Sequence, residues 1–162
     1  MKRTTSLTAL AVIGAATLAA PPAAHAEVGV GVFVGQPTGL DIKVDLARRS
    51  ALDIVIGWQD FDDGRDGYAH VTYLVGLGAA RGRSVFVPFR VGVGAVVYDD
   101  GSGGFGDEVN VGVRAPVEVG LRFRRTPLEI YGELALKLTL LDDGDDDDPI
   151  DADGGVGLRV YF

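Results

Sequence analysis

The end of the chain alternates between apolar and polar or small residues, a pattern typical of a β-strand. Residues 154–162 read Gly-Gly-Val-Gly-Leu-Arg-Val-Tyr-Phe. Successive side chains of a strand point to opposite faces, so one apolar face is formed by Val156, Leu158, Val160 and Phe162. In a soluble protein, such a terminal row would be an edge prone to aggregation. The pattern favours a strand that is paired on both sides, with an apolar medium against its apolar face.

The same alternation of period two occurs seven more times along the chain. Together with the terminal segment it predicts strands over residues 28–35, 40–46, 52–59, 68–77, 85–97, 109–123, 128–140 and 154–162. Each is long enough, or nearly so, for a tilted membrane-spanning strand of roughly 9–11 residues, and compact and longer connections alternate. The sequence therefore predicts an all-β fold, an eight-stranded antiparallel up-and-down transmembrane β-barrel.

Residues 1–26 have the layout of a secretory signal. Lys2 and Arg3 precede an apolar stretch over 7–20, and Ala24-His25-Ala26 is a small-residue cleavage site. We expect this segment to be cleaved, so that residues 27–162 form the barrel domain. The alternative is a retained N-terminal anchor, although the apolar stretch is short for a membrane-spanning helix.

The overall charge of the chain argues against some functions. Net charge is −8, and removal of the signal would take away two basic residues and no acidic one, which gives −10. We expect no nucleic-acid partner, because nucleic-acid binding relies on Lys and Arg that neutralise phosphates. The chain has no cysteine, which excludes disulfides, zinc-thiolate sites and a thiol nucleophile.

Charged residues occupy the predicted inner faces in nearly balanced numbers. The acidic residues are Asp41, Asp45, Asp53, Glu118, Glu129 and Glu133. The basic residues are Lys43, Arg90, Arg114, Arg122, Arg124, Lys137 and Arg159. Because buried charges must be paired or hydrated, this inventory favours a lumen filled by ion pairs.

The connections sort charge by sign. The short turns carry only basic residues, namely Arg48, Arg49, Arg81, Arg83, Arg124 and Arg125. The long connections 60–67, 99–108 and 142–153 are strongly acidic, with Arg65 as their one basic residue. A secreted β-sandwich is the alternative fold, and it offers no reason for this separation.

Proline and glycine mark irregular places. Gln36-Pro37-Thr38-Gly39 is turn chemistry, in which Pro fixes φ and Gly supplies a positive φ. Pro88 and Pro116 lie inside strand patterns, and because proline cannot donate to the ladder we expect a bulge or local distortion at each.

With these residues in view, the chain resembles the small eight-stranded bacterial outer-membrane barrels of the outer-membrane protein A and X type. The terminal Phe162 behind its alternating apolar residues also resembles the signal that the barrel-assembly machinery recognises in such proteins. The segment 35–43, followed by Ala51-Leu52-Asp53, is similar to short barrels that open with a Gly-x-Pro-Thr-Gly-Leu hairpin. That resemblance implies an outer-membrane barrel and no established activity.

The segment 142–153 is the most acidic of the chain. Carboxylates are hard ligands suited to Ca²⁺, although the spacing does not match an EF-hand. We predict weak divalent-cation binding by Asp145, Asp146, Asp147, Asp148, Asp151 and Asp153. The alternative is a solvated charge run without a shaped site.

Two other groups of residues bear on function, one as a candidate catalytic site and one as a membrane-interface girdle. Catalysis would need His70 with Ser102 and Asp62 or Asp66, but a His bonded to Asp or water at the lumen mouth is the simpler interpretation. The outward aromatic residues predict an interfacial girdle, and they are Trp58, Tyr73, Phe89, Phe123 and Phe162.

The sequence thus predicts a monomeric, non-enzymatic barrel in the bacterial outer membrane. Its expected partners are outer-membrane lipid, lipopolysaccharide and the barrel-assembly machinery. The expected role is structural or surface interaction through acidic outer loops, with no cofactor beyond the possible Ca²⁺. A narrow porin-like channel is the second interpretation, and a lipid-modifying barrel enzyme is the third.

Overall fold

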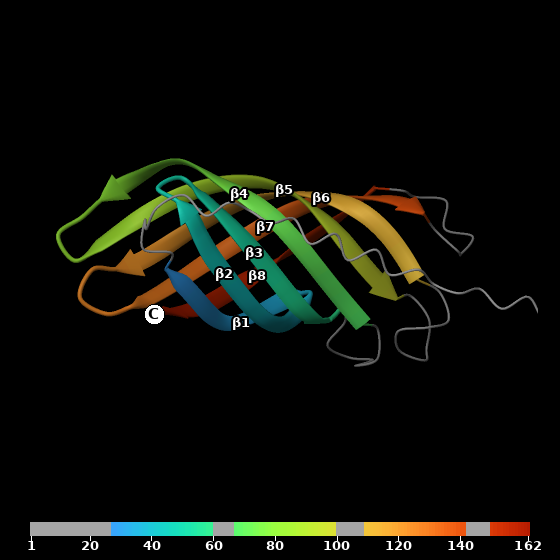
Figure 1. Ribbon diagram of the computed structural model, residues 1–162, viewed down its shortest axis with the longest axis horizontal. Coiled ribbons are helices and arrows are strands. Elements are labelled where there is room, and N and C mark those ends of the chain that lie inside the picture. The colour runs from blue at the N-terminus through green and yellow to red at the C-terminus, as the bar shows by residue number, and fades with distance from the viewer. Residues whose placement is uncertain (1–26, 60–66, 100–108, 142–149) are drawn as a thin grey trace, which may run out of the picture.

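The computed structural model describes residues 27–59, 67–99, 109–141 and 150–162, and these residues form one closed β-barrel. All neighbouring strands are antiparallel and follow one another in chain order (Figure 1). The strands are β1 (Val28–Gln36), β2 (Thr38–Ala47), β3 (Ser50–Trp58), β4 (Gly67–Arg81), β5 (Val85–Asp99), β6 (Val109–Phe123), β7 (Leu128–Leu141) and β8 (Ile150–Tyr161). The predicted all-β, eight-stranded up-and-down barrel is confirmed. Among the described residues, no helix has the length and hydropathy needed to cross a bilayer.

The barrel closes between its first and last strands. Val30 lies opposite Val160 and Val32 opposite Leu158 in the β1–β8 register. The Phe162 amide donates to the Val28 carbonyl at 2.9 Å, which extends the pairing to the last residue of the chain. The apolar terminal strand is therefore paired on both sides, because β7 covers its other edge.

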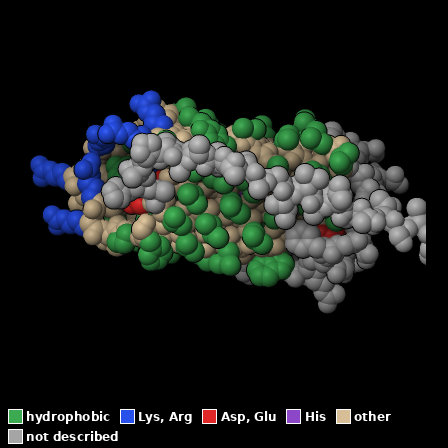
Figure 2. Space-filling model, viewed as in Figure 1, with side chains coloured by type: hydrophobic (Ala, Val, Ile, Leu, Met, Phe, Trp, Pro, Cys, Tyr) green, Lys and Arg blue, Asp and Glu red, His purple; other side chains and the backbone are tan. Residues whose placement is uncertain are grey.

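The two ends of the barrel differ in their connections. At the end here called the turn end, short turns at residues 48–49, 82–84 and 124–127 join the strands. Figure 2 shows Lys and Arg side chains gathered at this end, where Figure 1 places the C-terminus. The other end, here called the loop end, is where β3, β5 and β7 finish and β4, β6 and β8 begin.

The outer and inner faces of the strands separate as the alternation predicts. Large apolar side chains cover the outside (Figure 2), and Leu40, Leu134, Leu136 and Val93 are each more than 60% exposed. The inner positions carry most of the charge, and Asp41, Lys43, Glu118 and Arg159 are each at most 1% exposed. A polar interior and an apolar exterior invert the arrangement of a soluble domain.

The β1–β2 hairpin has its positive-φ glycine four residues earlier than predicted. Gly35, rather than Gly39, has the positive φ, at 153°. A Cβ on Gly35 would lie 2.3 Å from the Gly154 carbonyl oxygen on β8, so both conformation and close approach require glycine here. Thr38 closes the turn, since its hydroxyl accepts from the Gly35 amide at 3.2 Å and donates to the Gly35 carbonyl at 3.0 Å.

Predicted strand boundaries at two acidic segments were wrong, and β4 also runs to Arg81 rather than to residue 77. Strand β8 begins at Ile150 rather than at residue 154, and Ala152 and Asp153 pair with Leu136 and Ala135 of β7. Strand β5 likewise runs to Asp99, which is buried. In both places the acidic residues suggested a loop, but hydrogen bonds to the neighbouring strand continue the β-ladder.

The predicted irregularity at each internal proline is confirmed, and it is a local distortion of the β5–β6 ladder rather than a bulge. The β5–β6 register is the same on both sides of Pro88 and Pro116, but Cα pairing is interrupted at residues 87–88 and 92–93. A Cβ on Gly120 would lie 3.0 Å from Pro88 Cγ, so glycine leaves room for the proline ring. The register shift near Pro88 lies on β4, between Gly76 and Gly78.

Candidate functional site: the ion-paired lumen

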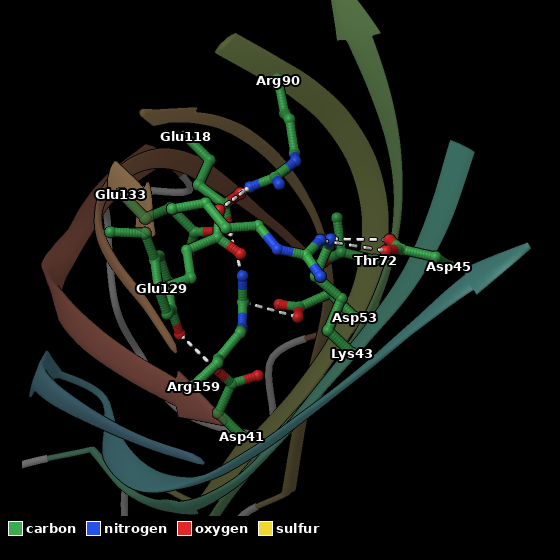
Figure 3. A network of polar contacts seen from close by, with 12 residues as sticks. Asp41, Lys43, Asp45, Asp53, Thr72, Arg90, Glu118, Glu129, Glu133 and Arg159 are labelled. Atoms are coloured by element: carbon green, nitrogen blue, oxygen red, sulfur yellow. Dashed lines mark hydrogen bonds and ion pairs between the residues drawn. The ribbon is translucent and has the colours of Figure 1, made fainter. Parts of the chain in front are cut away.

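Arg159 of β8 lies at the centre of the lumen and bonds to carboxylates from three other strands. Its Nε donates to Asp41 at 2.5 Å, and its two terminal nitrogens donate to Asp53 at 2.7 Å and Glu118 at 2.8 Å (Figure 3). The guanidinium also stacks over the Tyr131 ring at 3.6 Å, while the Tyr131 hydroxyl donates to Asp41 at 2.6 Å. Charge-assisted bonds of this kind are the strong class of hydrogen bond, and here they join opposite walls.

A second layer lies next to the centre, toward the turn end. Arg90 donates to Glu118 and, at 2.7 Å, to Glu129. The second oxygen of Glu129 accepts from the Tyr161 hydroxyl. Lys43 donates to that hydroxyl at 3.3 Å. Glu118 therefore bridges Arg90 and Arg159, so the two layers form one network.

The outermost part of the network lies at the turn end. Arg122 pairs with Glu27 and approaches Asp45 at 3.7 Å, and Lys43 donates to Asp45 at 2.7 Å. The Arg122 guanidinium lies 3.7 Å from the centroid of the Tyr161 ring. Glu27 and Asp45 remain partly exposed, so this layer is in contact with the opening.

On the loop-end side of the centre, Arg114 organises a layer around His70. Arg114 donates to Glu133 at 2.6 Å, to Thr72 at 3.2 Å and to Nε2 of His70 at 3.0 Å. Because Nε2 accepts, Nδ1 carries the proton and donates to the Tyr68 hydroxyl at 3.3 Å. His70 is 2% exposed, so it lies inside the barrel rather than at its mouth.

The last layer toward the loop end joins Lys137 to two aspartates of β8. Lys137 approaches Asp151 at 3.0 Å and Asp153 at 3.4 Å, and its ammonium lies over the Tyr98 ring at 4.2 Å. The Tyr68 hydroxyl donates to Asp153 at 3.1 Å. Tyr68 thereby connects this layer to His70 and continues the network along the barrel axis.

These layers occupy the central part of the lumen with side chains from all eight strands. Strand β1 contributes Phe33, which stacks on Tyr131 at 5.8 Å between ring centroids. Removing charge from water is costly, and the cost is offset only when partners and hydrogen bonds are supplied. The arrangement cross-links the barrel wall through ion pairs and hydrogen bonds between its own side chains.

Most of the predicted lumen charges lie where the sequence placed them. The exception is Arg124, which is exposed in the β6–β7 turn, so its assignment to the lumen was wrong. Its neighbour Arg122 is two residues earlier and still within β6, where the alternation directs it inward. The inward pattern ends with the strand at Phe123.

The predicted set of lumen groups did not include four tyrosines and one aspartate that take part in the network. Four of the five tyrosines point inward, and they are Tyr68, Tyr98, Tyr131 and Tyr161. Each shares the period-two parity of a charged or polar neighbour, as Tyr161 does with Arg159, and that signal was present in the sequence. Asp153, which was assigned to a loop, belongs to the lumen because β8 begins early.

The predicted cation-binding residues divide into two groups. Asp145–Asp148 lie outside the described residues. Asp151 and Asp153 both face the Lys137 ammonium, and within the described ranges no cluster of three or more potential metal ligands occurs. Cation binding by the acidic segment stays a prediction.

The residues weighed for catalysis are not assembled in the part of the chain that the structure describes. Ser102, Asp62 and Asp66 fall outside it, and His70 contacts Arg114 and Tyr68 instead. Of the predicted aromatic girdle, Trp58, Tyr73, Phe89 and Phe162 are exposed on the outer side, and Phe123 is half-buried.

Fold and lumen together define a class: a closed eight-stranded antiparallel β-barrel with an apolar exterior and an ion-paired interior. Comparison with protein-family models, with curated proteins and with solved structures found no match for this chain. The functional argument therefore rests on the barrel itself.

Proposed function

We propose that this chain is a monomeric structural barrel of the bacterial outer membrane, closed along its axis and presenting acidic loops at the cell surface. The observation that carries the proposal is the inversion of faces: apolar side chains such as Leu134 and Leu136 cover the outside, while Arg159 is fully buried within. Hydrocarbon is the medium in which such an exterior is stable, and barrel closure satisfies every backbone group internally.

The connections and charges at the two ends support one orientation of the barrel in the membrane. The turn end holds the connections 48–49, 82–84 and 124–127 together with Glu27 and Phe162, which suits the periplasmic side of a barrel whose long connections lie at the other end. The acidic long connections would then face outward, beside lipopolysaccharide. Residues 1–26, outside the described ranges, serve as the export signal in this proposal.

Gel mobility tests the membrane barrel. Detergent-extracted protein is compared boiled and unboiled, alongside fractionation of the envelope. A mobility shift on boiling and recovery in the outer-membrane fraction are expected, because a closed barrel resists SDS until heated. Soluble periplasmic protein without a mobility shift would overturn the proposed outer-membrane location of the barrel.

Conductance separates the structural barrel from the porin-like channel. Because Arg159 joins β2, β3 and β6 across the lumen, purified protein in planar bilayers is expected to show no stable open level. A reproducible single-channel conductance that is lost on boiling would favour the channel instead. A lipid-modifying activity, if detected, would be tested with His70→Asn.

Calcium titration tests the acidic loops. Asp145–Asp148 are replaced together by Asn, and a matched control replaces Asp60, Asp62, Asp63 and Asp66 on another acidic segment. If the run at 145–148 holds cations shared with lipopolysaccharide, only the first variant loses the calorimetric signal. Identical isotherms for wild type and both variants would remove cation binding from the proposal.

A further inference from the structure

A cavity of about 1150 Å³ opens at the turn end of the barrel. It lies inside the barrel mouth, since inward-facing Ala51, Leu74 and Pro88 contribute to its lining. Around its opening stand the turns 48–49 and 124–127 and the end of the β4–β5 hairpin. We call this cavity the vestibule.

Arginine dominates the vestibule. The rim carries two arginines on the β2–β3 turn, two on the β6–β7 turn and one on the β4–β5 hairpin, namely Arg48, Arg49, Arg124, Arg125 and Arg81. Deeper in, Arg90 and Arg122 also reach the lining, and each is already bonded to carboxylates. The two acidic residues of the lining, Glu27 and Asp45, both face Arg122.

The five rim arginines differ from every charge of the lumen. Within the described residues, their side chains make no ion pair, hydrogen bond or ring contact, and all five are exposed. They converge on one opening in a chain whose net charge is −8. Like charges held around a concave mouth produce a focused positive potential that attracts anions.

We propose that the vestibule binds a multivalent phosphate-bearing anion, supplied as a free oligophosphate or as a phospholipid headgroup. Guanidinium groups match phosphate oxygens in a bidentate geometry, and arginines on three separate turns suit several phosphates better than one. The position of Arg90, inside the mouth, favours a free anion that enters along the axis. This inference goes beyond the structural role proposed above. It does not depend on that role, because anion binding can be measured on the folded barrel in detergent.

The first experiment measures binding of inorganic tripolyphosphate by isothermal titration calorimetry to the full chain, folded in a zwitterionic detergent at low salt. Arg81→Gln is compared with Arg83→Gln, because both residues are exposed on the same hairpin but only Arg81 lines the vestibule. We expect Arg81→Gln to raise Kd about two- to fivefold, as for one exposed ion pair. Arg83→Gln is expected to leave Kd unchanged.

A second variant is designed to give a larger increase in Kd for tripolyphosphate. Replacing Arg48, Arg49, Arg124 and Arg125 by Gln should raise Kd about tenfold or more if each contributes as one exposed pair. The boiled-against-unboiled gel shift verifies that this variant is folded, and the Arg81 and Arg83 pair keeps the test valid if it is not. Absence of binding by wild type, or equal losses from Arg81→Gln and Arg83→Gln, would overturn the proposal.

The source of the phosphate is settled in nanodiscs. The titration is repeated in phosphatidylcholine alone and in phosphatidylcholine with phosphatidylglycerol. If anionic headgroups occupy the vestibule, they compete and weaken tripolyphosphate binding by wild type more than by Arg81→Gln. Equal affinities in the two lipids would identify a free anion as the ligand.

Discussion

Arginine occurs in two contrasting settings in this barrel. At the centre, Arg159 is fully buried and donates to Asp41, Asp53 and Glu118. At the turn end, Arg48 and Arg124 are exposed, and their side chains make no ion pair, hydrogen bond or ring contact within the described residues. The same side chain is thus a cross-link in one place and an unengaged charge in the other.

The contrast follows from the medium around each group. A buried charge loses its hydration, so it persists only where carboxylates and hydrogen bonds replace water. An exposed guanidinium keeps its hydration and gains little from an ion pair. Central arginines are therefore expected to determine stability, whereas rim arginines remain available for a ligand. Four substitutions test whether buried groups of the lumen contribute more to stability than exposed groups.

The largest effect is expected from Arg159→Met. The substitution leaves three buried carboxylates close together without their shared cation, which should lower the free energy of unfolding by about 3–5 kcal/mol. Urea unfolding in detergent, followed by fluorescence of Trp58, the single tryptophan, measures the change. Arg124→Met is the matched control and should leave the midpoint in place. Equal midpoints for both variants would mean that the network does not support the fold.

The next effect tests packing beside Arg159. A Cβ on Gly157 would lie 2.1 Å from the Tyr131 ring, which is held between Arg159 and Phe33, so Gly157→Ala should cost about 1–3 kcal/mol. A Cβ on Gly78 meets nothing within 4 Å, which makes Gly78→Ala the control. The same unfolding experiment compares the two, and a stable Gly157→Ala variant would show that the centre is loosely packed.

A smaller loss is expected from Tyr68→Phe, which removes the hydroxyl between His70 and Asp153. Lys137 still faces Asp153, so the expected cost is about 1.5 kcal/mol, as for one hydrogen bond to a charged group. Tyr73→Phe on the outer face is the control. A double-mutant cycle with Asp153→Asn measures the coupling, and a coupling of zero would contradict the bond.

The smallest effect is expected from Asp151→Asn. The Asp151 side chain is 60% exposed, and its pair with Lys137 should contribute about 0.5 kcal/mol or less. Asp153→Asn, at the same lysine but with a side chain that is 3% exposed, should cost more. If the two substitutions lowered the free energy of unfolding equally, burial would not explain why some ion pairs of this barrel are stronger than others.

Alternation alone predicted which residues face inward along most strands. Arg159 and Leu158 were assigned to opposite faces because neighbouring side chains of a strand must diverge. The same rule placed Asp41, Glu118 and Arg90 in one interior, and their opposite signs predicted pairing. The alternation rule also gives the inward orientation of the four lumen tyrosines, although aromatic residues are the type expected in an outer girdle.

Strand ends and side-chain partners could not be obtained in this way. Asp153 and Asp99 belong to strands because the neighbouring strand continues the ladder, and that neighbour is set by barrel closure. Arg124 lies outside because β6 ends at Phe123, one residue before it. No local rule indicates that Gly35, rather than Gly39, has the positive φ, and the close approach of Gly154 on β8 to Gly35 is set only by barrel closure.

The sequence by itself determined the fold class, the inward and outward faces and the concentration of arginine on the short turns, because each depends on residues near one another in the chain. Only the tertiary structure decided that Arg159 joins three strands, that Tyr68 links His70 to Asp153, and that arginines from three turns surround one vestibule. These features depend on the register and tilt with which eight strands close, which bring residues such as Asp41 and Arg159 within hydrogen-bond distance across the lumen.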